Sequence, residues 1–293
     1  MLSTRHLRLD AKERLALKTT FRRSFGFLLA YLWMNNLASE KSRRSVAVVM
    51  PVFNESEGIK LFLEEIDLSL KKYLVKFFVV EDCSTDSTLE VLDEAVKERA
   101  LHLDVIHNER NCGHGPSTIK ALLAGLNSGA EVIVSCDGDG QISGADLERM
   151  TDLFDDCGAV YVEGVRFSRS DVYYRRLVSF ATRVLVYFRC RQVPRDANTP
   201  FRAYHRQTLA QVLSSGQIGL FVPNLDISAY IRNSKIKITE LDVTSLPRRG
   251  SEPTGSTWGS RDSLLPSLKF LQFCFKAMID WTRKSASRSH QLK

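Results

Sequence analysis

Cysteine and histidine are both sparse in this chain of 293 residues, with six of each. No two cysteines form a C-x-x-C pair, and no histidine stands at a spacing that builds a zinc site. The cysteines occupy positions 83, 112, 136, 157, 190 and 274. We therefore expect no zinc site, and we expect the cysteines to be small core residues or free thiols in a reducing compartment such as the cytoplasm.

Long hydrophobic runs are also missing. The two most apolar stretches, residues 25–34 and the amphipathic run 264–281, fall short of the roughly 18 to 20 apolar residues that span a bilayer. We expect both stretches to lie on a membrane surface or to pack on the body of the protein. A signal-peptide core is the alternative interpretation of the first stretch, because it follows a basic segment.

Several ligand-binding signatures are incomplete. Gly113-His114-Gly115 begins like a dinucleotide fingerprint, but Thr118 stands where the third glycine belongs. A calcium-loop template that starts at Asp137 has Ile142 at its sixth position instead of glycine. No Walker-type lysine pattern and no nucleophile elbow is present. These absences argue against a dinucleotide-binding fold, an EF-hand, a P-loop enzyme and a serine hydrolase.

Acidic residues are scarce at both ends of the chain. Residues 1–44 carry ten Lys/Arg against three Asp/Glu, and residues 261–293 carry seven against two, so the middle is mildly acidic although the net charge is +7. No recognition motif for nucleic acid accompanies this charge, and an anionic membrane surface is the favoured partner. We divide the chain into a basic, partly apolar segment 1–44, a domain 45–260, and an amphipathic basic helix and tail 261–293.

What the chain does contain is a repeated alternation of short apolar runs with helical patterns. The expected strands are residues 45–50, 77–80, 103–106 and 132–136, and the expected helices are residues 56–73, 84–99 and 116–128. This alternation is typical of βαβ units, so it predicts an α/β fold with a mostly parallel sheet flanked by helices.

Polar clusters follow each expected strand: Asn54-Glu55, Asp82, residues 108–115, and residues 137–141. In parallel sheets, ligands bind outside the carboxyl ends of the strands. The four clusters are therefore expected to meet at one edge of the sheet and to form one site.

The segment Asp137-Gly138-Asp139-Gly140-Gln141 is the most informative of these clusters. Two carboxylates one residue apart at the end of a buried strand suit Mg²⁺ or Mn²⁺ carrying a diphosphate, because these ions prefer oxygen ligands and keep positions open for substrate phosphates. The glycines allow the backbone to approach the ligand closely.

Residues 166–206 contain ten arginines and no lysine. The fixed fork of arginine suits bidentate binding of phosphate, so this run favours phosphate recognition. The alternative is an exposed helix face, residues 171–190, laid on an anionic membrane.

Five segments together carry a family resemblance. They are residues 49–55 (VMPVFNE), 79–88 (VVEDCSTDST), 111–115 with 121–125 (NCGHG and ALLAG), 137–141 (DGDGQ) and 196–204 (DANTPFRAY). Over about residues 45–260 the chain resembles the family-2 glycosyltransferases of GT-A fold, most closely the branch that glycosylates polyprenyl phosphates.

This resemblance implies roles for particular residues. Residues implied in binding the nucleotide-sugar donor are Pro51, Phe53, Asn54, Glu55, Asp82, Asp137, Arg166, Arg248 and Arg249, with Asp82 accepting hydrogen bonds from the base. The implied metal ligands are Asp137, Asp139 and Gln141, and the implied catalytic residues are Asp139, Arg202 and Asp226. Arg248 and Arg249 stand in a Gly/Ser-rich stretch, residues 245–260, that resembles the loop closing over donor phosphates.

The implied reaction is inverting transfer of a sugar from a UDP-, GDP- or dTDP-linked donor to a polyprenyl phosphate, assisted by Mg²⁺ or Mn²⁺. A phosphate acceptor is largely dianionic at neutral pH, with a second pKa of about 6, and needs no general base. A saccharide hydroxyl would need one, and Asp226 is then the candidate. A non-catalytic sugar-nucleotide-binding scaffold and a nucleotidyltransferase are the remaining alternatives, although residues 51–55 are not the glycine-rich basic loop of a nucleotidyltransferase.

The chain departs from the family pattern at two places. Pro200 stands where glycine usually precedes Phe-Arg, and the C-terminal membrane spans of many bacterial relatives are not seen. We therefore expect peripheral binding to the cytosolic face of the membrane, or a membrane-protein partner or homo-oligomer.

Overall fold

One sheet organises the part of the chain that the computed structural model describes, residues 43–167 and 173–249. Its strands are β1 (Ser45–Val52), β2 (Leu74–Glu81), β3 (Leu103–His107), β4 (Val132–Ser135), β5 (Tyr161–Phe167), β6 (Arg202–His205) and β7 (Thr239–Thr244). The helices are α2 (Ile59–Ser69), α3 (Thr88–Glu98), α4 (His114–Asn127), α5 (Gly144–Asp156), α6 (Tyr173–Cys190), α7 (Arg206–Ser214) and α8 (Pro223–Asn233). The predicted α/β fold is confirmed.

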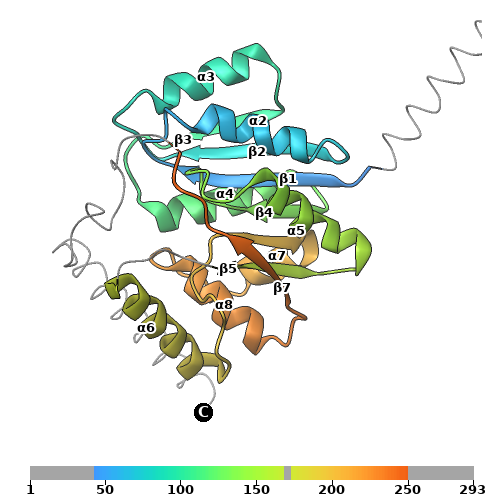
Figure 1. Ribbon diagram of the computed structural model, residues 1–293, viewed down its shortest axis with the longest axis vertical. Coiled ribbons are helices and arrows are strands. Elements are labelled where there is room, and N and C mark those ends of the chain that lie inside the picture. The colour runs from blue at the N-terminus through green and yellow to red at the C-terminus, as the bar shows by residue number, and fades with distance from the viewer. Residues whose placement is uncertain (1–42, 168–172, 250–293) are drawn as a thin grey trace, which may run out of the picture. The chain divides into compact units, whose positions relative to one another are not determined.

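The strands lie in the order β3-β2-β1-β4-β6-β5-β7 (Figure 1). β3, β2, β1 and β4 are mutually parallel, and β6 runs antiparallel to both of its neighbours, β4 and β5. The carboxyl ends of the first four strands therefore share one edge, as the alternation of strands and helices predicted.

Alternation along β1 builds the two layers of the core. Val48 and Met50 face α2, α3 and α5, whereas Ala47 and Val49 face α4, α7 and α8. Successive residues of a strand point to opposite faces, so an all-apolar strand marks a sheet covered on both sides. Gly125 of α4 is needed at this contact, since a Cβ there would lie 2.6 Å from a methyl group of Val49.

All three predicted helices begin at different residues in the structure, and α3 starts at Thr88 instead of residue 84. α2 starts at Ile59 instead of residue 56, because the carbonyl of Glu55 accepts hydrogen bonds from the Gly58 and Ile59 amides and closes a turn before the helix. α4 begins at His114, directly after Gly113, whose φ of 90° is unfavourable for other residues.

Some predictions fall outside the described residues. These are the apolar stretches 25–34 and 264–281, most of segment 1–44, all of segment 261–293, and residues 250–260 of the Gly/Ser-rich stretch. The domain boundaries at 44 and 260 thus stay predictions. In the described part, no helix combines the length and apolar content needed to cross a bilayer.

Candidate active site

The loops after β1 and β2 are joined by hydrogen bonds at the carboxyl edge of the sheet. Asn54, at φ 55°, donates its backbone N–H to Ser84 Oγ at 3.0 Å and accepts the Thr85 amide on its side-chain oxygen at 2.8 Å. Pro51 and Phe53 belong to the same chain segment, with Pro51 buried and Phe53 half-buried. The residues predicted to line the nucleotide pocket therefore sit on a rigid double loop.

Asp82 organises the next loop. It is 3% exposed, and its carboxylate accepts hydrogen bonds of 2.8 Å each from the Asn108 side chain and the Cys112 and Gly113 amides. Within the described residues, Oδ1 accepts two of these hydrogen bonds and Oδ2 accepts one, from the Gly113 amide, so Oδ2 keeps acceptor capacity for a nucleobase. Recognition of the base by Asp82 stays a prediction.

Glu81 is a site residue that the sequence did not single out. It is fully buried, and its carboxylate accepts hydrogen bonds from the Cys83 and Ser84 amides while contacting His107 Nδ1 at 2.6 Å. Cys83 has a φ of 58°, which is costly for a residue with a side chain. Glu81 therefore holds the turn that carries Ser84. A charged residue directly after the apolar run of residues 77–80 was the available signal.

Asp137 and Asp139 stand at the end of β4. Burial, together with the neighbouring charge of Asp137, raises the pKa of Asp139 to about 6. Asp139 accepts the Gln141 amide at 3.1 Å, and His114 Nε2 lies 3.6 Å from Asp137. A buried carboxylate with raised proton affinity next to a second carboxylate favours an added cation at this corner.

Glu55 adds a third acid to this region. It is 8% exposed, and burial raises its pKa to about 7, with the charges of Asp139 and Asp137 adding to the shift and Arg248 opposing it. Arg248 pairs with the Glu55 carboxylate and reaches the Asn54 carbonyl at 3.4 Å. A cationic side chain therefore lies on the acidic edge of the sheet.

The segment after β7 lies along the Asp137–Gln141 turn. Its backbone donates from Leu246 to the Gln141 carbonyl at 2.9 Å and from Arg249 to the Asp139 carbonyl at 3.1 Å. Gly140 makes this approach possible: its φ is 66°, and a Cβ there would lie 2.6 Å from the Arg249 side chain. Residues far apart in sequence thus form one wall of the site.

Arg249 is held by α2. Its guanidinium pairs with Glu65 and lies 5.2 Å from the centre of the Phe62 ring. Glu65 also accepts the Gly144 amide at 2.6 Å. The pKa of Glu65 is lowered, because the hydrogen bonds from Gly144 and Arg249 outweigh the opposite effect of burial. The pair therefore anchors the segment that carries Arg248.

If the chain binds the nucleotide-sugar donor that the sequence predicts, Glu65→Gln is expected to weaken that binding about fivefold, or about 1 kcal/mol, because the neutral amide keeps the bond to Gly144 but loses the charge that fixes Arg249. Titration of purified protein with nucleotide-sugar donor measures this change. Glu64→Gln, at the adjacent exposed position, is the matched control and should leave the affinity unchanged. Equal effects of the two variants would show that no anchor exists.

Arg166 lies close enough to Asp139 to lower the pKa of that carboxyl. It makes two hydrogen bonds with Asp196, of 2.7 and 3.1 Å, and a third with the Asn198 carbonyl at 3.2 Å. Arg166 thus ties the loop after α6 to β5 and contributes positive charge beside the acidic corner.

Arg202 lies beneath the site and is fully buried. It donates to the Tyr161 hydroxyl at 2.6 Å and to the Ser228 hydroxyl at 3.0 Å. Backbone carbonyls of Thr199, Ala197 and Asn224 take its remaining hydrogen bonds. Direct contact with substrate would require these bonds to break, so the structure favours a positioning role over the expected catalytic one.

Asp226 is also enclosed. It is 2% exposed, with Oδ1 2.6 Å from Arg189 Nη1 and Oδ2 accepting the Gly219 amide at 2.8 Å. One carboxylate oxygen thus joins α8 to α6, and the other joins α8 to the loop that precedes α8. A general base for a hydroxyl acceptor would first have to leave these partners.

A divalent ion fits the residues at the end of β4 when it is shared with a ligand. In the described residues, no group of three or more His, Cys, Asp and Glu side chains could hold a metal by itself. Mg²⁺ is commonly bound by one or two carboxylates together with substrate phosphates. Asp137 and Asp139 are two carboxylates that lie unfavourably close together, so they match a Mg²⁺ site that is completed by substrate phosphates.

The mostly parallel sheet, with its acidic corner at the carboxyl edge, is of the GT-A class of fold, as the solved structures described below also show. Residues 47–213 match the family model described as glycosyl transferase family 2. The chain therefore belongs to glycosyl transferase family 2.

Similar sequences include two proteins named undecaprenyl-phosphate 4-deoxy-4-formamido-L-arabinose transferase. The one from Yersinia enterocolitica is 26% identical over 203 residues, covering 68% of this chain and 60% of the relative. The one from Pectobacterium atrosepticum is 26% identical over 208 residues, covering 70% and 61%. The matched part of the chain thus spans about three fifths of these relatives.

Solved structures share the fold. Mannosyl-3-phosphoglycerate synthase from Rubrobacter xylanophilus superposes with a TM-score of 0.57 at 15% identity, covering 87% of this chain and 77% of that one. Glucosyl-3-phosphoglycerate synthase from Mycobacterium tuberculosis, solved with Mn²⁺ and UDP-glucose, gives 0.51 at 19% identity and covers 74% of each chain. At these identities the likeness concerns architecture alone.

Proposed function

We propose that this protein transfers a sugar from a nucleotide-diphosphate donor to a polyprenyl phosphate at the cytosolic face of a membrane. The observation that carries the proposal is the pairing of acidic and basic groups at one edge of the sheet. Asp137 and Asp139 attract a cation, while Arg248 and Arg166 lie close enough to affect the proton affinity of Asp139. A diphosphate bound through a divalent ion satisfies both sets of charges.

Each side of the donor has residues assigned to it. Pro51, Phe53, Asn54 and Asp82 would bind the nucleoside, because they line the double loop after β1 and β2. Asp137 and Asp139, with Gln141 beside them, would hold Mg²⁺ or Mn²⁺, which when bound neutralises the departing diphosphate. Arg248 would leave Glu55 for the phosphates, with Arg249 as its anchor.

The acceptor is assigned from two observations. The relatives are named for transfer to undecaprenyl phosphate. In addition, Asp226, the carboxylate suggested as base for a hydroxyl acceptor, has both oxygens engaged. A phosphate acceptor is already ionised at neutral pH and needs no such base, so direct attack on the anomeric carbon with inversion is the simplest reaction.

The testing experiment incubates purified full-length protein with short-chain polyprenyl phosphate and pooled UDP-, GDP- and dTDP-sugars in the presence of Mn²⁺. A new lipid with the mass of one added sugar is expected, and EDTA should abolish it while Mn²⁺ or Mg²⁺ in excess restores it. Mass spectrometry of the lipid measures the product and identifies the sugar class.

The matched control replaces the acceptor with the corresponding polyprenyl alcohol, which lacks the phosphate and should give no product. Slow hydrolysis of the donor without any glycosylated lipid would overturn the assignment of acceptor and favour a saccharide hydroxyl. Product formation that persists in EDTA would instead overturn the assignment of the metal to Asp137 and Asp139.

A further inference from the structure

α6 has two faces of different character. Its inner face packs on α8, where Val186 and Cys190 lie in one buried cluster with Leu225 and Ala229. The pair between Arg189 and Asp226 reinforces this contact. The orientation of α6 about its own axis is thereby fixed.

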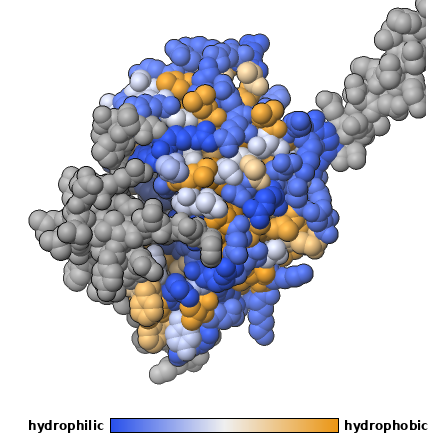
Figure 2. Space-filling model, viewed as in Figure 1, coloured by the Kyte–Doolittle hydropathy of each residue, from blue (hydrophilic) through white to orange (hydrophobic). Residues whose placement is uncertain are grey.

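The outer face of α6 carries large apolar side chains that are exposed. Phe180 is 62% exposed and Phe188 is 67% exposed, and Val193 in the following loop is 57% exposed. Phe180, Val184, Tyr187 and Phe188 recur at the spacing of one helical stripe. We call these four residues and Val193 the α6 outer face. Figure 2 shows hydrophobic and hydrophilic residues side by side where Figure 1 draws α6.

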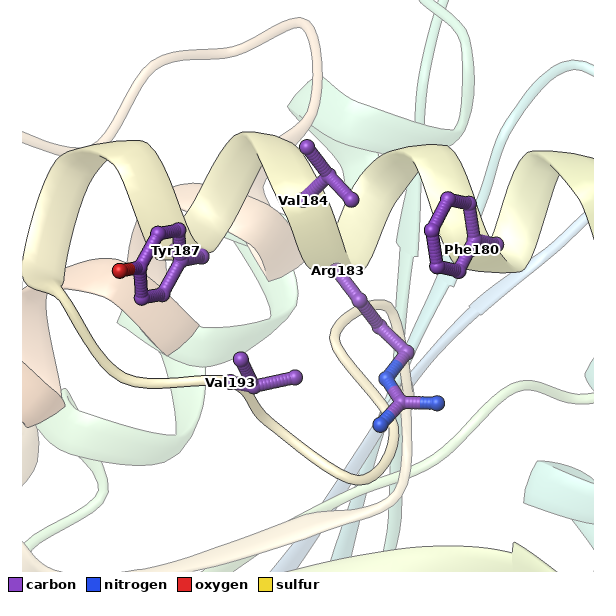
Figure 3. A pocket seen from close by; sticks show the side chains of 5 residues that line it. All are labelled: Phe180, Arg183, Val184, Tyr187 and Val193. Atoms are coloured by element: carbon purple, nitrogen blue, oxygen red, sulfur yellow. The ribbon is translucent and has the colours of Figure 1, made fainter.

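A shallow groove of about 210 Å³ runs along this face. Figure 3 shows its lining residues, with Val193 in the loop that returns beside the helix and Arg183 next to it. Arg183 donates to the Pro194 carbonyl at 2.9 Å, which holds the loop against the helix. The apolar surface is therefore formed jointly by α6 and the loop that follows it.

Basic residues predominate around this face. Residues 172–195 contain six arginines and no aspartate, glutamate or lysine. Two of these arginines pair with acids of other elements, Arg189 with Asp226 and Arg195 with Glu240 and Asp242. Arg191 is exposed, with its guanidinium 6.0 Å from the centre of the Tyr187 ring. Aromatic side chains beside arginines are complementary to an anionic lipid surface, where rings enter the headgroup boundary and guanidinium groups meet phosphates.

We propose that the α6 outer face is the surface by which this protein docks on an anionic membrane. The proposal rests on the function proposed above in one respect, since a lipid-phosphate acceptor has to be reached from a membrane surface. The docked face is connected to the site: Asp196 follows α6 by six residues and pairs with Arg166. Docking through α6 would therefore bring the acidic corner and its arginines near the headgroup layer.

The first test is sedimentation of full-length protein with vesicles of phosphatidylcholine alone and of phosphatidylcholine with phosphatidylglycerol. Wild type is expected to bind the anionic vesicles, and the double variant Phe180→Ser with Phe188→Ser should lower the partition coefficient at least about tenfold. The matched control is Leu61→Ser with Leu68→Ser, two exposed leucines of α2 that are 61% and 70% exposed. Binding lost equally in both double variants would overturn the proposal.

Activity separates this proposal from the proposed function. With a short-chain acceptor in detergent, Phe180→Ser with Phe188→Ser should match wild type, whereas with acceptor embedded in anionic vesicles it should be several-fold slower. If wild type is active and the double variant is equally active with both forms of the acceptor, the docking surface is overturned and the proposed function is not. An inactive wild type would count against the function and leave the vesicle sedimentation as the test of docking.

Hydrogen exchange identifies the occupant of the face. Peptides covering residues 179–195 should gain protection when anionic vesicles are added and not when phosphatidylcholine vesicles are added. Full protection without vesicles would show that another segment of the chain covers the face. Protection that rises with protein concentration would show a second copy there. Either result would overturn membrane docking through α6.

Discussion

Replacing Asp139 by asparagine is expected to reduce the rate of sugar transfer at least about 1,000-fold, because the departing diphosphate loses the carboxylate best placed to hold its cation. The amide preserves the size of the side chain and can still accept the Gln141 amide. Initial rates with saturating donor and Mn²⁺ measure the effect, and excess metal should restore little of it.

The same variant should fold at least as stably as the wild type in the absence of metal. The pKa of Asp139 is raised from 3.8 to about 6 in the folded protein, so the folded state binds this proton more tightly than the unfolded chain. That stabilisation is complete below about pH 4 and is lost as the pH rises through 6. At pH 7 the wild type therefore carries a penalty of at most about 3 kcal/mol that asparagine removes.

Thermal unfolding at pH 5 and pH 7 checks this second expectation. The difference in melting temperature between variant and wild type should be more favourable to the variant at pH 7. Asp104→Asn is the matched control, since Asp104 is an exposed residue of β3 that pairs with Lys76. This substitution should change neither the activity nor the pH dependence of the melting temperature. A variant that unfolds at both pH values would make Asp139 a structural residue.

Replacing Arg202 by methionine is expected to lower the free energy of unfolding by about 4 kcal/mol or more. Methionine fills a similar space but removes one donor each from the hydroxyls of Tyr161 and Ser228 and from three backbone carbonyls. Tyr161 keeps its hydrogen bond to Glu163, and Ser228 keeps its hydrogen bond to the Ala197 carbonyl. Each unsatisfied buried group costs about 1 to 3 kcal/mol. Since whole domains are stable by about 5 to 15 kcal/mol, the variant should be largely unfolded near body temperature.

Urea unfolding followed by circular dichroism measures this change. Arg206→Met, four residues on and exposed, is the matched control and should alter the free energy of unfolding by no more than about 0.5 kcal/mol. The opposite pattern, in which Arg202→Met is as stable as wild type yet inactive, would return Arg202 to the catalytic role that the sequence suggested.

The buried network around Arg202 extends to the ion pair of Glu163 with Arg232. Glu163 also lies 3.1 Å from the Tyr161 hydroxyl, and both groups are fully buried. Burying this many charged groups is tolerated because each has several hydrogen-bond partners. The network fixes β5, β6 and α8 beneath the acidic corner.

The sequence by itself determined the strands β1 to β4, the layers and the edge at which the site forms, but it did not predict β5, β6 or β7. The apolar run of residues 46–52 in β1 predicts a strand covered on both faces, and the polar residues after each strand predict where ligands bind, because both properties are local. Asp137 and Asp139 could be named for the same reason. Their spacing and the preceding strand lie within one short segment.

Only the tertiary structure decided which charged side chains face the site and which are buried as partners. Arg248 and Glu55 are separated by 193 positions, and Arg249 and Glu65 by 184, so no local pattern relates them. The identities of Arg202 and Asp226 in the sequence do not show whether their side chains are exposed or buried. Their roles depend on where α6, α8 and β6 pack, and packing is set by contacts summed over the whole chain.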